Sequence, residues 1–287
     1  MPPSSAGGIG LLQTLAILDG TPFATDGPGS SQFFHFLAEA SRRSFADRAA
    51  CIGDPAFAGF PDYLLDPVRI AALRRSIDPE RATRSTDLST AAAPCERSCT
   101  THLSVIDRDG NAAALTFTLN GIYGSGVTIP GLGFLLNNNM DNFSAKPGMP
   151  NQYGMMQSDV NAIRPGKRPV SSMAPTIVTR DGDVEIVMGT PGGPTIVTAT
   201  AQALLYMLEF GWNPRDAIEA RRTHHQWMPD TLFIEDGIAA DVLKGLEARG
   251  HRLQLKFPLT DMNAIVRRNG WLEGAVDNRR EGVVAGF

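Results

Sequence analysis

A change of hydrophobic period at Thr100 constrains the fold of this chain more than any other feature. Over residues 102–106 and again over 112–119 the side chains follow a period of two, and Asp109-Gly110 lies between the two runs. A period of two on both sides of an Asp-Gly pair is typical of a β-hairpin with a tight turn. We therefore expect Thr100 to lie at the start of a hairpin.

Further strands and helices are predicted downstream and upstream of this hairpin. A second hairpin is predicted over 176–188, with Asp181-Gly182 at its turn. Helical spacing predicts helices over 8–18, 30–50, 196–210, 214–222 and 241–249, and shorter runs predict strands over 251–256, 264–268 and 272–276. Hairpins followed by helices, without βαβ alternation, indicate the α+β class.

Composition excludes several classes of function. The chain has 287 residues, 43% of them hydrophobic, so it can bury a large core as one large domain or two ordinary ones. Its formal net charge is −4 and it has no basic run, which argues against a nucleic-acid partner. No apolar segment is long enough to span a membrane. The odd number of cysteines, three, argues against a disulfide framework, although one Cys95–Cys99 bridge stays open.

Thr100 gains a chemical function if the bond after Cys99 is cut. Cleavage would make Thr100 a new N-terminus, with a hydroxyl and an α-amine on the same residue. An α-amino group has a pKa of about 7.7–8.0, so it can take the proton of the hydroxyl near neutral pH. The alternative is an ordinary pair of strand threonines, Thr100-Thr101, and only the motifs elsewhere in the chain favour the nucleophile.

Six short motifs occur along the chain in order. They are Pro2-Pro3-Ser4-Ser5-Ala6-Gly7-Gly8, Ala46-Asp47-Arg48 with Gly53-Asp54-Pro55, Thr100-Thr101-His102, Leu135-Leu136-Asn137-Asn138, Lys167-Arg168-Pro169-Val170-Ser171-Ser172-Met173, and Pro191-Gly192-Gly193. By these motifs the whole chain resembles the γ-glutamyltransferases (γ-glutamyltranspeptidases), which are N-terminal-nucleophile hydrolases. The resemblance implies a four-layer αββα sandwich, incomplete at its N-terminal side, in which Thr100 opens a central strand.

The resemblance also implies how the chain is divided. Residues 1–99 would be the C-terminal part of a large chain, with a cleavable connector in the Pro-, Ser- and Thr-rich stretch 53–100. Residues 100–287 would be the small, catalytic chain, and both parts would contribute to one αββα domain. Met1 matches a methionine inside the family's large chain. We therefore expect a longer precursor, which would also hold an arginine for the substrate α-carboxylate; the implied location is periplasmic or secreted.

The resemblance assigns catalytic roles to four residues. Thr100 would be the nucleophile and Thr118, on the second strand of the hairpin, would orient it, although by itself Thr118 could equally be a solvent-facing strand residue. Gly192 and Gly193 would donate backbone N–H groups to the oxyanion, since glycine lets the backbone approach a substrate and a helix start follows. A lone Pro-Gly-Gly would otherwise indicate only a tight turn between a strand and a helix.

Further residues would bind the α-amino acid end of a γ-glutamyl substrate. Ser171 and Ser172 match a serine pair that binds the α-carboxylate, and Asn120 matches a residue that contacts the α-amino group. Tyr153 lies in a polar stretch, 141–160, that matches the family's lid loop in length. Without the resemblance, two serines and an asparagine are usually loop or cap residues.

The run 137–144 departs from the family pattern at the ammonium end of this site. The family has Gln or Glu, Met and two aspartates before Phe-Ser, whereas this chain has Asn139, Met140, Asp141 and Asn142. Asn139 and Asn142 are therefore the predicted contacts, and Asn142 replaces the aspartate that faces the α-ammonium. A charge-assisted hydrogen bond contributes roughly 1.5–3 kcal/mol against about 1 for a neutral one, so this site should hold a γ-glutamyl ammonium less tightly and accept a glutaryl group more readily.

The sequence thus predicts an autoprocessed enzyme, a γ-glutamyltransferase or glutathione hydrolase, that passes a γ-glutamyl group to amino acids, peptides or water. Its two cleaved chains would stay associated, and no nucleic acid, membrane or cofactor is implied. No metal is expected either, because the adjacent His224-His225 would chelate one ion poorly. Two alternatives stay open: a cephalosporin (glutaryl) acylase of the same fold, and an inactive fragment that needs its N-terminal half.

Overall fold

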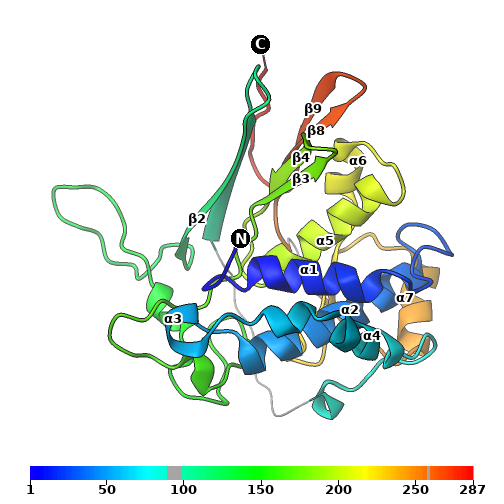
Figure 1. Cartoon of the computed structure of the whole chain (residues 1–287), viewed down its shortest axis with the longest axis horizontal. Coiled ribbons are helices and arrows are strands. Elements are labelled where there is room, and N and C mark those ends of the chain that lie inside the picture. Colours follow the sequence, from blue (N-terminus) through cyan, green and yellow to red (C-terminus); the bar gives the residue numbers. More distant parts are fainter. Residues whose placement is uncertain (89–98, 257–258, 287) are drawn as a thin grey trace.

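The computed structural model describes residues 1–88, 99–256 and 259–286 (Figure 1). Its helices are α1 (Gly7–Leu18), α2 (Ser31–Cys51), α3 (Pro55–Ala58), α4 (Pro67–Arg75), α5 (Thr195–Leu208), α6 (Pro214–Glu219) and α7 (Ala240–Ala248). Its strands are β1 (Cys99–Ile106), β2 (Ala112–Asn120), β3 (Thr176–Arg180), β4 (Asp183–Gly189), β5 (Thr223–His224), β6 (Leu232–Ile234), β7 (Leu253–Leu255), β8 (Asn263–Arg268) and β9 (Trp271–Val276). The described residues therefore have an α+β fold.

Both predicted hairpins and the five predicted helices are present, with ends that differ by at most a few residues. The cap predicted for α2 is Ser30, whose side chain accepts a hydrogen bond from the Phe33 N–H. Two short strands, β5 and β6, were not predicted, because two or three residues are too few to show a period.

Part of the stretch 53–100 is helical rather than a flexible connector. It carries α3 and α4, which begin in the same way: Asp54 and Asp66 accept hydrogen bonds from the first turn, and a proline follows each at the first helical position. An Asp-Pro pair is typical of a helix start, so the sequence pattern could have predicted both helices. Residues 89–98 of the predicted connector, which include Cys95, lie outside the described residues.

Two larger sheets differ in their connections. Strands β3, β4, β8 and β9 form an antiparallel sheet in that order. Strands β5, β6 and β7 form a second sheet, in which β6 and β7 are parallel and α7 joins them. This single βαβ unit was not predicted, although the described strands otherwise show no βαβ alternation.

Helices α1, α2 and α4 lie together, and α5 packs against α1 and reaches towards the sheet of β3, β4, β8 and β9 (Figure 1). Stacked aromatic rings join α2 to the end of α5: the Phe33 and Tyr206 ring centroids are 5.2 Å apart and those of Tyr206 and Trp212 are 4.6 Å apart. Since α1, α2 and α5 are buried around most of their circumference, they form the core of the molecule.

The β1–β2 hairpin packs one face against β4 and β8 and leaves the other open. On the packed face, a Cβ at Gly189 would lie 2.3 Å from the His102 ring, so only glycine fits there. Apolar side chains occupy the open face and are 42–61% exposed: Leu103, Val105, Leu115 and Phe117. Nothing in the described part of the chain covers this apolar face.

Candidate active site

The register of the hairpin places Thr100 opposite Thr118. The Thr100 hydroxyl donates to the Thr118 Oγ1 at 3.0 Å, and the Asn120 backbone N–H donates to the same Oγ1 at 2.8 Å. Thr100 is buried, and Thr118 faces it rather than solvent. The structure therefore contains the predicted contact between the two threonines.

A small cavity opens in front of Thr100. Its lining includes all but two of the predicted site residues, namely Thr100, Thr118, Asn120, Asn142, Tyr153, Ser171, Ser172 and Gly193, together with Met155, Met173 and Ile196. Gly192 and Asn139 are not in this lining. We call the part around Thr100, Thr118 and Gly193 the nucleophile end, and the part around Asn142, Ser171 and Ser172 the head-group end.

Asn120 and Tyr153 form one wall of the cavity. The Tyr153 hydroxyl lies 2.9 Å from the Asn120 carbonyl oxygen and 2.6 Å from its Oδ1, and the Asn120 Nδ2 donates to the Asn138 carbonyl oxygen at 3.2 Å. The Asn138 Oδ1 in turn accepts the Gly121 N–H at 2.7 Å. Asn138 therefore helps to orient Asn120, and although it belongs to a recognised motif, it was not among the predicted site residues.

The first motif of the chain lies directly behind the serine pair. The Ala6 N–H donates to the Ser171 carbonyl oxygen at 2.9 Å, and the Ser5 hydroxyl donates to the Met173 carbonyl oxygen at 2.7 Å. Gly7 is required because a Cβ there would lie 2.3 Å from the same Met173 oxygen. Within the described residues the Ser172 hydroxyl has no hydrogen-bond partner, so it is available to a ligand.

Asn142, and not Asp141, faces the cavity at the head-group end. The Asp141 Oδ2 accepts the Gln152 N–H at 3.1 Å, on the side of the lid stretch, and burial raises the pKa of Asp141. The Asn142 Nδ2 donates to the Asn139 Oδ1 at 3.3 Å, so Asn139 contacts Asn142 rather than the cavity itself. Among the described residues, the cavity lining has no charged side chain.

The Pro191-Gly192-Gly193 turn leads from β4 to α5. Gly192 and Gly193 have φ values of +130° and +59°, a backbone conformation that favours glycine. Within the described part of the chain, neither of their N–H groups donates a hydrogen bond, whereas the Gly192 carbonyl accepts the Thr195 hydroxyl at 2.8 Å. Two unpaired N–H groups beside a helix start suit a developing oxyanion.

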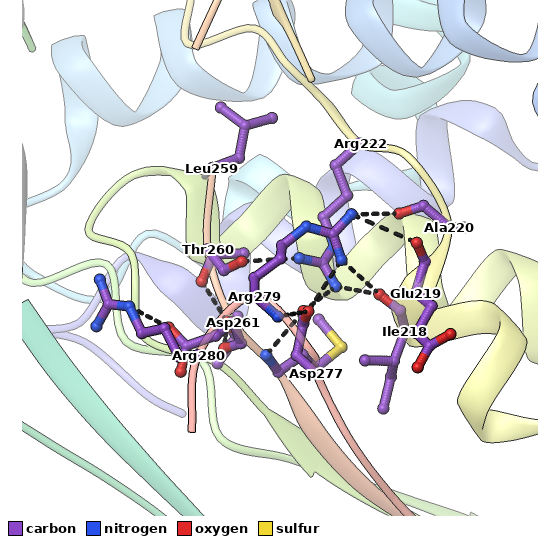
Figure 2. Close-up of polar contacts among 12 residues, drawn as sticks. Ile218, Glu219, Ala220, Arg222, Leu259, Thr260, Asp261, Asp277, Arg279 and Arg280 are labelled. Atoms are coloured by element: carbon purple, nitrogen blue, oxygen red, sulfur yellow. Dashed lines mark hydrogen bonds and ion pairs between the residues drawn. The ribbon is translucent and has the colours of Figure 1, made fainter. Parts of the chain in front are cut away.

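A buried ionic network supports this turn from behind (Figure 2). Thr260 hydrogen-bonds Thr190 and the Pro191 carbonyl, and the Arg222 Nη1 donates to the Thr260 carbonyl oxygen at 2.9 Å. Arg222 is paired with Asp277 at 2.5 Å, and Arg279 joins Asp277 at 2.9 Å. No local sequence pattern indicates this network, because Arg222 is far from Thr260, Asp277 and Arg279 in the chain.

His224 and His225 are both buried, and each ring nitrogen of His224 has a hydrogen-bond partner. The His224 Nδ1 lies 2.8 Å from the Thr198 hydroxyl and its Nε2 lies 2.9 Å from the Gln226 Oε1. Burial lowers the pKa of His224 to about 3 and that of His225 to about 4, so both rings are neutral at physiological pH. Over the residues with described positions, no group of three or more His, Cys, Asp or Glu side chains could hold a metal ion, and no helix is long and apolar enough to cross a membrane.

An α+β fold with a threonine at a strand start, facing a cavity and close to a Gly-Gly turn, agrees with the class of the N-terminal-nucleophile hydrolases. A family model described as gamma-glutamyltranspeptidase matches residues 1–287. The chain belongs to the γ-glutamyltranspeptidase family.

Individual relatives agree with this assignment. The chain is 43% identical to the glutathione hydrolase proenzyme of Escherichia coli (strain K12), a match that covers 100% of this chain and 50% of that protein. A γ-glutamyltranspeptidase structure from Pseudomonas nitroreducens, complexed with L-DON, is 45% identical with a TM-score of 0.63, over 65% of this chain and 99% of that chain. A cephalosporin acylase structure from Bacillus halodurans is 25% identical with a TM-score of 0.84, over 100% of this chain and 50% of that chain. The chain thus spans about half the length of the curated relatives it matches.

Proposed function

We propose that the protein containing this chain is an autoprocessed γ-glutamyl acyltransferase and hydrolase that acts on glutathione and related γ-glutamyl amides. One observation carries the proposal: in a member of the γ-glutamyltranspeptidase family, a buried Thr100 hydroxyl, its Thr118 partner, the Gly193 turn and the Ser171-Ser172 pair line a single cavity. The acyl group would pass to amino acids, peptides or water.

The proposed reaction takes place at the nucleophile end of the cavity. After cleavage before Thr100, its free α-amine would take the hydroxyl proton while Oγ1 attacks the γ-amide carbonyl. Thr118 would hold the hydroxyl in place through the 3.0 Å contact, and the N–H groups of Gly192 and Gly193 would stabilise the oxyanion. Collapse releases the amine and leaves a γ-glutamyl ester on Thr100, and an acceptor amine or water then attacks this ester and frees the threonine.

The same hydroxyl would perform the maturation step. Thr100 Oγ1 would attack the carbonyl of Cys99, the amide nitrogen would leave as the new α-amine, and water would open the resulting ester. The products would be a part that ends at residue 99 and a catalytic part, 100–287, that stay associated. The described contacts support this, since Ser5 and Ala6 on one side hold Met173 and Ser171 on the other.

The open apolar face of the β1–β2 hairpin is the observation from which we infer a further layer of secondary structure packed on it. Exposed apolar side chains on a sheet face are typical of a surface that another element covers. We assign this layer to helices of a preceding polypeptide, which would complete an αββα sandwich and supply the cation that the head-group end lacks. Alone, the present chain should therefore be poorly soluble and weakly active. Because the chain belongs to the γ-glutamyltranspeptidase family, we expect the complete protein to be periplasmic or secreted.

A cephalosporin or glutaryl acylase is the second candidate, and Asn142 favours it. The cavity lining has Asn142 where a carboxylate would bind an ammonium. An acyl group without an ammonium therefore loses less binding free energy here, relative to a γ-glutamyl group, than it would in a site with a carboxylate. The likeness to the cephalosporin acylase of Bacillus halodurans points in the same direction. The serine pair and the lid stretch favour the γ-glutamyl activity over the acylase activity.

The test uses the complete protein with Thr100→Ala and the matched control Thr101→Ala, an exposed neighbour on the opposite face of β1. Wild type and Thr101→Ala should show two fragments by intact mass and should hydrolyse γ-glutamyl-p-nitroanilide faster than glutaryl-p-nitroanilide. Thr100→Ala should stay uncut and lose activity by at least ~10³-fold. Complete cleavage of Thr100→Ala would contradict the assignment of the nucleophile, and a preference for the glutaryl substrate would establish the acylase instead.

A further inference from the structure

Asn161 lies behind the head-group end and has no role in the mechanism above. It ends the 3-10 turn Asp159–Asn161 and is 1% exposed. It is not part of the cavity lining. Whatever it contributes to substrate binding must therefore act through its neighbours.

The carboxamide of Asn161 joins two separate walls of the cavity. Its Nδ2 donates to the Asn142 carbonyl oxygen at 2.7 Å, and its Oδ1 accepts the Val170 N–H at 3.2 Å. Asn142 is the residue predicted to meet the α-ammonium, and Val170 directly precedes the serine pair predicted to meet the α-carboxylate. One buried side chain thus links the two walls that a head group would have to contact at the same time.

The position of Asn161 is itself fixed from both sides. The Lys167 Nζ donates to the carbonyl oxygens of Val160 and Ala162, at 2.7 and 2.9 Å, and so holds the residues on either side of Asn161. A Cβ at Gly53 would lie 2.5 Å from the Val160 oxygen, so glycine is required there. The motifs that contain Gly53 and Lys167 therefore act together to hold this turn.

A second amide strengthens the link on the Asn142 side. The Gln157 Nε2 donates to the same Asn142 carbonyl oxygen at 3.2 Å, and Gln157 also accepts a hydrogen bond from Asn161. Buried polar groups that satisfy one another in this way fix a single arrangement, because breaking one bond leaves its partner unsatisfied. These hydrogen bonds connect the Asn142 wall to the Val170 wall through the side chain of Asn161.

We propose that Asn161 is a positioning residue that fixes the spacing between Asn142 and the Ser171-Ser172 pair, and thereby selects an α-amino acid head group. The inference rests on the proposed function. A γ-glutamyl group places an ammonium and a carboxylate on the same carbon, so it needs both walls at a set distance. A glutaryl group has no ammonium and needs only the serine wall, so it should be less sensitive to the link.

The test compares Asn161→Ala with Ser44→Ala in the complete protein, using γ-glutamyl-p-nitroanilide and glutaryl-p-nitroanilide. Ser44 is the matched control: it is buried and donates to the Gly10 carbonyl oxygen at 3.1 Å, but it lies on α2 and is not part of the cavity lining. Asn161→Ala should raise KM for the γ-glutamyl substrate about tenfold and for the glutaryl substrate about twofold, with kcat changed by less than about twofold. Ser44→Ala should leave both KM values unchanged.

A double variant tests whether the rise in KM caused by Asn161→Ala depends on Asn142. In an Asn142→Ala background, Asn161→Ala should raise the γ-glutamyl KM no more than about twofold further, because coupled residues are not additive. An unchanged KM in Asn161→Ala, an equal rise for both substrates, or an equal rise in Ser44→Ala would overturn the inference while leaving the proposed function intact. Absence of γ-glutamyl turnover by the wild-type protein would overturn both.

Discussion

The nucleophile end and the head-group end of the cavity are built in different ways. Thr100 and Thr118 face each other because the β1–β2 register pairs them, and backbone hydrogen bonds along two strands set that register. Asn142 ends a short 3-10 turn and the Ser171-Ser172 pair lies outside any helix or strand, and the Asn161 side-chain amide joins these two segments. A strand register is rigid and local, whereas a loop arrangement depends on each of its side-chain contacts.

This difference predicts which kinetic constant each end controls. Changes at the nucleophile end alter groups that act on the reacting carbonyl, so they should lower kcat. Changes at the head-group end alter ground-state binding and should act mainly on KM. Substitutions at each end, measured by steady-state kinetics, test this division.

Gly193→Val should lower kcat by ~10²-fold or more. A β-branched residue does not hold a φ of +59°, so the turn and its N–H groups would move. Gly193→Asn is the control, since asparagine accepts positive φ, and it should retain more activity in steady-state assays. Gly192 is less suited to this test, because a Cβ there would lie 2.3 Å from the Thr195 hydroxyl and disturb the fold. Equal activity of the two Gly193 variants would place the donors elsewhere.

Thr118→Val should lower kcat by ~10- to 30-fold and leave KM nearly unchanged. The valine keeps the shape but removes the oxygen that accepts both the Thr100 hydroxyl and the Asn120 N–H. Thr118→Ser, which keeps the oxygen, should recover most of the rate. A rise in KM without a fall in kcat would contradict the division between the two ends.

Asn142→Asp should raise the ratio of kcat/KM for γ-glutamyl over glutaryl substrates by roughly five- to thirtyfold, equivalent to about 1–2 kcal/mol. The new carboxylate would face the cavity and the substrate ammonium, as Asn142 does now. Asp141→Asn is the control, because Asp141 faces Gln152 instead, and it should change the ratio little. A flat ratio in Asn142→Asp would show that the ammonium binds somewhere else.

The packed face of the hairpin should also make the nucleophile end sensitive to acid. Burial lowers the pKa of His102 from 6.5 to about 4. Between these two values the unfolded state binds more protons than the folded state, so the free energy of unfolding should fall as the pH drops from 6.5 towards 4. Urea titrations of wild type and His102→Gln at pH 7 and pH 5 should show a smaller loss in the variant. The same loss in both would assign the acid sensitivity to the other buried histidines.

Local patterns in the amino-acid sequence predict most of the helices and strands and many of the residues that meet in the cavity. Periods of two around Asp-Gly turns predicted both hairpins, and helical spacing predicted α1, α2, α5, α6 and α7, because these patterns follow directly from strand and helix geometry. The ordered motifs indicated the family, and most of the predicted site residues do line one cavity.

The packing of separate segments against one another determines which of those residues face the cavity and what holds them there. Asn139 and Asn142 are close in sequence, yet only Asn142 lines the cavity, while Asn139 supports it. Asn161 and the Arg222–Asp277 pair show no local pattern, because each contacts residues of other segments of the chain. A sequence pattern reports a residue's own backbone geometry, whereas a buried contact depends on which distant segment folds against it.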